Sequence, residues 1–433
     1  MAYYPNYHID TLQNKLRIVS IPIKNAVELK IGIHLDVGYY EETKPNIGVA
    51  HFLEHLIATH LREGPMAKEI QEKGIYLSAN ASTSTFRTLY HLGGDAKYWK
   101  EILALILDTY LNRKIDTNIL SRERNAIIVE MNKKRAHTEE FMTSVALPQL
   151  MFGNKTKVQR NAKLHVQNVF NITPRMLSKF MNKFYQPDRT VIVISGKFRR
   201  NQLLPILKNK LQNIPNNHYP LNRVVTKRIS RQAKVLCINN NREVCTCILS
   251  FYAFTSNQYR EKYACYFLSR ILSGIGSKSI LFQRLRVKLG MTYSPNISTT
   301  VNKYYATFNI SFDTKKKHLQ TILSEIVNIL IELKNNLLDK EYLSLALDNY
   351  NLGVKKAYVN IIPATFIQYG DKILDNDQIF TPKEIFNNFH KKITAAYIRS
   401  ISRKIFKKEF ANLVILGKDV SFTQQLSQIL NKI

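Results

Sequence analysis

The stretch from Gly48 to Leu61, GVAHFLEHLIATHL, places two histidines four residues apart, with a glutamate directly before the second. On a helix, His51 and His55 project from one face one turn apart, close enough to bind a single metal ion. Glu54 lies three residues after His51, so its carboxylate reaches the same side. Imidazole suits zinc, and a catalytic zinc site has three protein ligands and one open position for water. The stretch therefore predicts two of three zinc ligands.

A second segment, SRERNAIIVEMNKKR, offers the carboxylate that the first one lacks. As a helix it places Glu123, Ile127 and Glu130 on one face, and a carboxylate on the buried side of a helix is costly unless it is paired or binds a metal. We predict that Glu130 is the third ligand of one zinc ion and that Glu123 orients the site. The alternative is an ordinary helix carrying imidazoles and a surface carboxylate.

The chain is internally duplicated. ITPRMLSKFMNKFYQPDRTVIVISGK, from Ile172, aligns without a gap to ITAAYIRSISRKIFKKEFANLVILGK, from Ile393. Upstream, DTNILSRERNAIIVEMNKK aligns to DKEYLSLALDNYNLGVKKA, where Ala346 and Gly353 replace the two glutamates. In the second copy, the counterpart of the histidine motif should lie in YACYFLSRILSGIG, which has neither histidine nor glutamate. The fold therefore does not require the polar residues of the first copy, which favours a functional role for them.

Each copy is predicted to run strand, strand, helix, strand, helix, helix, helix, strand. Because this order lacks a strict alternation of strands and helices, the predicted fold class is α+β, with two homologous domains that are each a mostly antiparallel sheet with helices packed on it. The polar, proline-bearing stretch over 213–223 is the predicted linker between a metal-binding domain over 1–212 and a second domain without metal over 224–433.

Composition and charge narrow the class of protein. The four cysteines among 433 residues have no C-x-x-C spacing, which argues against a disulfide framework and a zinc ribbon. The first residues lack a signal or transit pattern, and no apolar run reaches the length of a transmembrane helix. We therefore expect an unprocessed, intracellular, cytoplasmic protein, with a virion or an organelle as the alternative location.

The formal net charge of +31 attracts anionic partners. Nucleic acid or a virion core is therefore a candidate partner of the basic surface. The alternative is a compositional bias, because lysine and asparagine are abundant throughout the chain and the basic residues form only short runs. No nucleic-acid reader motif accompanies the charge.

The histidine motif and its surroundings resemble a known family. His-x-x-Glu-His is the signature of the inverzincins, and the chain is similar to the pitrilysin and mitochondrial-processing-peptidase (M16) family of zinc peptidases. The family's Gly-x-Ala-His-Phe-Leu-Glu-His run matches at Gly48 and from Ala50 to His55. NASTSTFRTLYHL, from Asn80, is similar to the family's Asn-Ala strand, and LFQRLRVKLGMTYS, from Leu281, resembles its segment with a paired arginine and tyrosine.

The resemblance implies a zinc endopeptidase whose two halves close like a clam around a chamber that holds an extended peptide. His51, His55 and Glu130 would bind one zinc ion. Glu54 would be the general base, and Glu123 would support the catalytic site.

The resemblance also implies residues that bind the substrate. Asn80 and Ala81 would lie on an edge strand that pairs with the peptide backbone, while Arg286 and Tyr293 from the other half would hold the substrate carbonyl. An ordinary strand end and a helix-terminal salt bridge are the alternatives for these two pairs.

Two further alternatives concern the whole chain. Because such families contain inactive partners, the protein is either a peptidase or a catalytically inactive scaffold or partner subunit of the same fold. Chains of this length in the family often dimerise, so a homodimer or a heterodimer with a similar chain is expected. Isolated histidines receive no role at this point; they are His137, His165, His218, His318 and His390.

Overall fold

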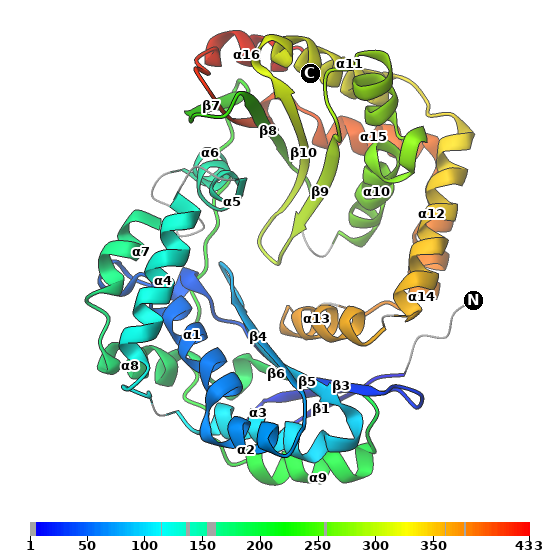
Figure 1. The fold of residues 1–433 in the computed structure, drawn as a ribbon. Coiled ribbons are helices and arrows are strands. Elements are labelled where there is room, and N and C mark those ends of the chain that lie inside the picture. The colour runs from blue at the N-terminus through cyan, green and yellow to red at the C-terminus, as the bar shows by residue number, and fades with distance from the viewer. Residues whose placement is uncertain are drawn as a thin grey trace.

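The computed structural model describes residues 6–113, 115–135, 139–153, 162–254, 258–359, 361–375 and 378–433. These residues form two β-sheets, each covered by helices (Figure 1). The six strands of the first sheet are β1 (His8–Thr11), β2 (Arg17–Pro22), β3 (Glu28–Leu35), β4 (Leu77–Thr83), β5 (Thr88–Asp95) and β6 (Thr190–Gly196). The five strands of the second are β7 (Lys234–Asn239), β8 (Val244–Tyr252), β9 (Asn296–Val301), β10 (Ala306–Lys315) and β11 (Asn412–Gly417).

The two sheets repeat one topology. The first has the order β1-β2-β6-β3-β5-β4, and the second has the order β7-β11-β8-β10-β9. In each sheet the last strand pairs in parallel with an early strand, β6 with β2 and β11 with β7, and the other pairs are antiparallel. In their order across the first sheet, the five strands β2, β6, β3, β5 and β4 thus correspond one by one to the strands of the second sheet. This confirms the predicted α+β fold with two similar halves.

Helices follow the same duplicated order. The first half contains α1 (Val49–Glu63), α2 (Pro65–Glu72), α3 (Trp99–Leu111), α4 (Leu120–Arg135), α5 (Glu139–Phe141), α6 (Leu147–Phe152), α7 (Ala162–Val169), α8 (Pro174–Phe184) and α9 (Arg200–Leu211). The second contains α10 (Tyr259–Ser269), α11 (Leu319–Asn335), α12 (Lys340–Val359), α13 (Ile361–Leu374), α14 (Pro382–Asn388), α15 (Ala395–Ile405) and α16 (Thr423–Leu430).

The structure contains more elements than the predicted order, including β1 before the two predicted strands and additional helices before the last strand of each half. The single strand predicted after the first helix is a hairpin, β4 and β5 in the first half and β9 and β10 in the second. The β4 sequence LSANAST is polar and largely exposed, so it lacks the apolar alternation by which strands are recognised. A further helix follows the last strand of each half, α9 and α16.

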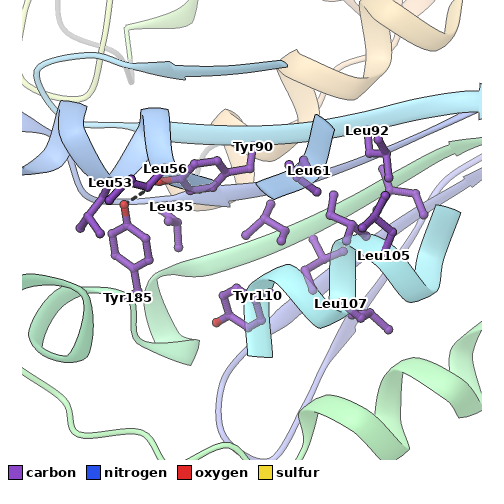
Figure 2. Packing of buried hydrophobic residues seen from close by; sticks show 14 of the residues in the cluster. Leu35, Leu53, Leu56, Leu61, Tyr90, Leu92, Leu105, Leu107, Tyr110 and Tyr185 are labelled. Carbon is purple, nitrogen blue, oxygen red and sulfur yellow. Dashed lines mark hydrogen bonds between the residues drawn. The ribbon is translucent and has the colours of Figure 1, made fainter. Parts of the chain in front are cut away.

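The main core of the first half lies between one face of its sheet and its own helices. Figure 2 shows leucines of α1 and α3 packed beside Leu35 and Leu92 of the sheet. The hydroxyls of Tyr90 and Tyr185 share a hydrogen bond of 2.8 Å inside this core. Because these side chains exclude water from the sheet face, they fix α1 on the sheet.

The opposite face of each sheet is covered by a helix from the other half (Figure 1). Phe366 and Tyr369 of α13 pack against Val19, Ile21 and further valines of β2 and β6. Reciprocally, an apolar cluster joins α6 to the second sheet; it contains Leu147, Met151, Phe152, Ile248, Tyr252, Val414 and Leu416. Each half therefore contributes a helix that packs on the sheet of the other half, so the linker is not the only connection between them.

Ion pairs reinforce this junction. The Arg223 guanidinium, 2% exposed, donates to Asp36 Oδ1 at 2.6 Å and to Glu41 Oε1 at 2.6 Å. Arg87 pairs with Asp36 and also with Asp375, which follows α13. Because each buried charge has a partner of opposite sign, the cost of removing it from water is offset. No helix among the described residues has the length and apolar character needed to cross a membrane.

Candidate metal centre

The helix α1 carries the histidine motif, and its start is fixed by an acidic cap. Gly48, with φ of 101°, ends the preceding turn in a conformation that favours glycine. Both oxygens of the Glu42 carboxylate then accept backbone N–H groups, from Gly48 and from Ala50, at 3.0 Å each. A carboxylate satisfies the unpaired N–H groups at a helix start and complements its dipole. The position of His51, one residue later, is therefore well defined.

The helix α4 carries the candidate carboxylates and lies beside α1 (Figure 1). Ile127 and Met131 of α4 are buried in the first core. The Arg124 side chain donates to two backbone oxygens, Val169 O at the end of α7, at 3.1 Å, and Ile172 O beyond it, at 2.9 Å. Apolar packing and these hydrogen bonds hold α4 against its neighbours, so its glutamates face α1.

Three donor groups converge between the two helices. The Nε2 atom of His51 lies 3.5 Å from Glu130 Oε1, and Nε2 of His55 lies 3.1 Å from Glu130 Oε2. One ligand atom from each of the three residues lies within 4.8 Å of the other two. Among the described residues, this group of side chains has ligand atoms close enough together to hold one metal ion.

Glu123 contacts the far side of one imidazole. Its Oε2 lies 3.3 Å from Nδ1 of His55, and its Oε1 accepts from Thr59 Oγ1 at 3.0 Å. A ligating histidine usually donates its other ring N–H to a carboxylate, which fixes the tautomer and the ring orientation. The Glu123 side chain is almost fully buried, and Arg122 Nε also donates to its Oε1 at 3.3 Å.

Glu54 lies beside the cluster as the sequence spacing predicts. Its Oε2 is 4.0 Å from Nε2 of His51, and its side chain is 14% exposed. Burial above all raises the pKa of the Tyr90 and Tyr185 hydroxyls, and the negative charge of Glu54 adds to the effect on both. The carboxylate therefore has the histidines on one side and two protonated hydroxyls in its neighbourhood.

The donor set fits a divalent cation such as zinc. Three carboxylates, Glu54, Glu123 and Glu130, surround two imidazoles in a partly buried place, and a bound cation would balance their charge. Burial favours neutral His55, but the hydrogen bonds and charges of the glutamates outweigh it and raise its pKa. Two nitrogen ligands and one carboxylate match the ligand types of catalytic zinc sites.

The second half builds the same elements without donors. In YACYFLSRILSGIG, Tyr266 and Arg270 occupy the places of the two histidines, and the Arg270 guanidinium donates to the Tyr266 hydroxyl at 2.5 Å. On α12, Ala346 is buried, whereas a Cβ added at Gly353 would meet nothing within 4 Å. Space for a side chain thus exists at the counterpart of Glu130, and sterics do not explain the missing carboxylate.

The candidate substrate strand is β4. It lies at the end of the first sheet, paired on one side with β5. The Ala81 backbone N–H donates to the side-chain oxygen of Asn80 at 2.9 Å. The helix α1 packs against β4. An edge strand beside the histidine helix has backbone groups suited to pairing with a peptide.

Arg286 and Tyr293 lie together in the second half. Arg286 Nη1 donates to Tyr293 O at 2.9 Å, and its guanidinium lies 4.2 Å from the centre of the Tyr293 ring. The Tyr293 side chain is strongly exposed. The structure thus brings this pair into contact with each other, and it brings His51, His55, Glu54, Glu123 and Glu130 together in the first half.

The sequence reading missed two residues beside the cluster. Glu42 caps α1 from six residues before its N-cap, Gly48, so no N-cap spacing in the sequence marked it. His165 of α7 lies with its ring centre 5.2 Å from that of His51, although 114 residues separate them by number. No local pattern marks such a contact. His137, also assigned no role, lies outside the described residues.

Two family models match the chain. Residues 17–159 match the model described as insulinase (peptidase family M16). Residues 171–350 match the model described as the peptidase M16 inactive domain. The first match contains the whole histidine and glutamate cluster, and the second contains none of it.

Curated relatives are about a quarter identical to the chain over the residues that align. The mitochondrial-processing peptidase subunit beta of Dictyostelium discoideum is 28% identical over 212 residues, which are 48% of this chain and 45% of that protein. The cytochrome b-c1 complex subunit 1 of Mus musculus is 24% identical over 48% of this chain and 43% of that protein. The probable zinc protease PqqL of Escherichia coli is 24% identical over 58% of this chain and 28% of that protein. The match thus spans less than half the length of each of these relatives.

Solved structures share the fold over nearly the whole chain. A protease from Helicobacter pylori has a TM-score of 0.81 at 18% identity and covers 96% of this chain and 100% of its own. The periplasmic protease PqqL from Escherichia coli has a TM-score of 0.80 at 17% identity and covers 100% of this chain and 51% of its own. At these identities the likeness establishes the fold.

Proposed function

Because the chain belongs to peptidase family M16, we propose that it is a zinc-dependent endopeptidase that cleaves peptides or unfolded protein segments. The observation that carries this proposal is the donor set of His51, His55 and Glu130, whose ligand atoms lie within 4.8 Å of one another. The Glu54 carboxylate lies beside this set and is placed to handle a proton. The candidate ligands and the candidate base thus lie in one place, which supports the proposal.

The residues of the first half divide the chemistry among them. His51, His55 and Glu130 would hold the zinc ion, which when bound supplies the Lewis acidity that activates water and polarises the scissile carbonyl. Glu54 accepts the proton of the attacking water and donates it to the leaving amine. Glu123 accepts from Nδ1 of His55 and so keeps the ring in the tautomer with Nδ1 protonated, which leaves the Nε2 lone pair toward Glu130.

Residues outside the cluster are proposed to hold the peptide. The edge strand β4, with Asn80 and Ala81, offers backbone groups for pairing with an extended substrate. Arg286 and Tyr293 offer a guanidinium and a phenol that are already in contact with each other. On closure of the two halves these donors would bind the substrate carbonyl, as expected from the family resemblance.

An inactive scaffold or partner subunit is the second candidate. The relatives favour it in part, because cytochrome b-c1 complex subunit 1 is among them and the second half matches an inactive domain. The first half argues for activity, because a scaffold has no need for a base beside three metal ligands. Relatives named as subunits also support a partner chain of the same family, and light scattering of the purified protein would reveal the complex it forms.

Replacement of Glu54 by glutamine tests the proposal. We expect Glu54→Gln to retain about one zinc per chain, because the ligands are untouched, and to lose at least about 100-fold of the peptide cleavage rate, the usual scale of general-base catalysis. Zinc is measured by metal analysis and cleavage with a quenched fluorescent peptide.

Glu69→Gln is the matched control, since Glu69 is an exposed glutamate of the neighbouring helix α2 that pairs with Lys73. Cleavage by Glu54→Gln at the unmutated rate would overturn the proposed base. Zinc bound by the unmutated protein without any cleavage would favour the scaffold, and absence of zinc would overturn the metal centre itself.

A further inference from the structure

His165 is a buried histidine that the proposed reaction does not use. It lies on α7, is 2% exposed, and its ring meets the ring of His51 nearly edge-on, with centres 5.2 Å apart and planes at 78°. The His55 ring also contacts His51, with ring centres 4.7 Å apart and planes at 84°. The His51 imidazole thus contacts two rings that restrict its rotation.

The close approach of His165 extends to the start of α1. A Cβ added at Gly48 would lie 2.9 Å from His165 Cδ2 and 3.0 Å from its Nε2. The imidazole therefore occupies the space where a side chain at this position would sit. Gly48 meets two demands, a left-handed φ and room for His165.

The helix that carries His165 is fastened on two sides. Arg124 of α4 donates to the carbonyl oxygens of Val169 and Ile172, at the end of α7 and beyond it. Asn168 Nδ2 donates to Lys44 O at 2.7 Å, which ties α7 to the turn before α1. The same α4 carries the glutamates of the cluster. The position of His165 relative to the donors is thus set by the helices that hold the donors.

We propose that His165 is a positioning residue of the metal centre, which holds the His51 ring in the orientation that metal binding requires. This inference rests on the proposed zinc site. A ring that fixes a ligand raises metal affinity, because the free protein then loses less side-chain freedom on binding. His165 itself is not proposed as a ligand, since the donor atoms that converge belong to His51, His55 and Glu130.

The second half offers a comparable contact, although the alignment of Ile172 with Ile393 places Phe386, and not His390, opposite His165. Its His390, close after α14, lies among aromatic rings, with Tyr350 at 4.1 Å and Phe267 at 5.0 Å. It is also stacked on Tyr266, the counterpart of His51, at 6.2 Å and 5°. A ring from this region thus packs on the same helix position in both halves. In the first half the packed partner is a metal ligand, so the packing acquires a functional effect.

The test compares the metal site of three variants with that of the unmutated protein. Cobalt(II) serves as the probe, because its visible absorption reports ligand geometry and its titration gives an affinity. We expect His165→Ala to weaken cobalt affinity by about 10-fold and to change the absorption spectrum. His165→Phe, which keeps a flat ring against His51, is expected to restore both.

Val169→Ala is the matched control, because Val169 is fully buried on the same helix and belongs to the first core. It is expected to lower the unfolding temperature while leaving the cobalt spectrum unchanged. An unchanged affinity and spectrum in His165→Ala would overturn this inference alone. Failure of the unmutated protein to bind cobalt or zinc would overturn the metal centre and, with it, this role of His165.

Discussion

Glu123 offers the sharpest test of how the cluster is held, because it acts through His55. Its Oε2 lies 3.3 Å from His55 Nδ1, and its Oε1 accepts from Thr59 Oγ1 at 3.0 Å. A hydrogen bond to a charged group contributes about 1.5–3 kcal/mol, against about 0.5–1.5 kcal/mol for a neutral pair. Since about 1.4 kcal/mol is tenfold in affinity, the carboxylate would account for roughly 10- to 100-fold of the affinity of the proposed zinc site.

Two replacements separate its charge from its shape. Glu123→Gln keeps an acceptor for the His55 N–H but removes the charge, so we expect zinc affinity to fall roughly 10-fold. Glu123→Ala removes both, and we expect a fall of roughly 100-fold. Zinc dissociation constants are measured at fixed pH by competition with a chelating dye.

Glu72→Gln, an exposed change on α2, controls for the loss of one negative charge. Zinc dissociation constants within twofold of the unmutated value for both Glu123 variants would refute the reasoning. Equal losses in Glu123→Gln and Glu72→Gln would show that overall charge, and not the contact with His55, determines affinity.

Two further predictions concern the second half. Gly370→Ala would place a Cβ 2.4 Å from the His34 ring and prevent α13 from packing on the first sheet. At Gly353 an added Cβ meets nothing within 4 Å, so Gly353→Ala should stabilise α12 by about 0.5–1 kcal/mol. Urea unfolding of the two variants measures this contrast, and equal stabilities would contradict it. Burial lowers the pKa of His390 to about 4, below the ordinary value of about 6.5, so the folded protein favours the neutral ring and the unfolded chain takes up the proton first. Stability is therefore fully present above pH 6.5 and falls by up to about 3 kcal/mol as the pH drops to 4; His390→Phe should remove this part of the pH dependence of the urea midpoint, and an unchanged slope would contradict the assignment.

The sequence alone was enough to predict the candidate ligands because their signal is local. His51 and His55 are one helical turn apart, and Glu123 and Glu130 share a face two turns apart, whatever the rest of the chain does. The duplication added an internal control, since the second copy forms the same helices with Ala346 and Gly353. Strands with strong apolar alternation were predictable for the same reason, while the polar β4 was recognised from its family resemblance and not from its pattern.

Only the tertiary structure decided which distant groups meet. It gave His55 its second partner in Glu123, set His165 against His51, and placed α13 on the first sheet and α6 on the second. Side-chain periodicity specifies which face of a helix is apolar, but it does not specify which surface covers that face. Which surface covers that face depends on shape complementarity and burial over both halves. The candidate donors could therefore be predicted from the sequence, and the residues that hold them in place could not.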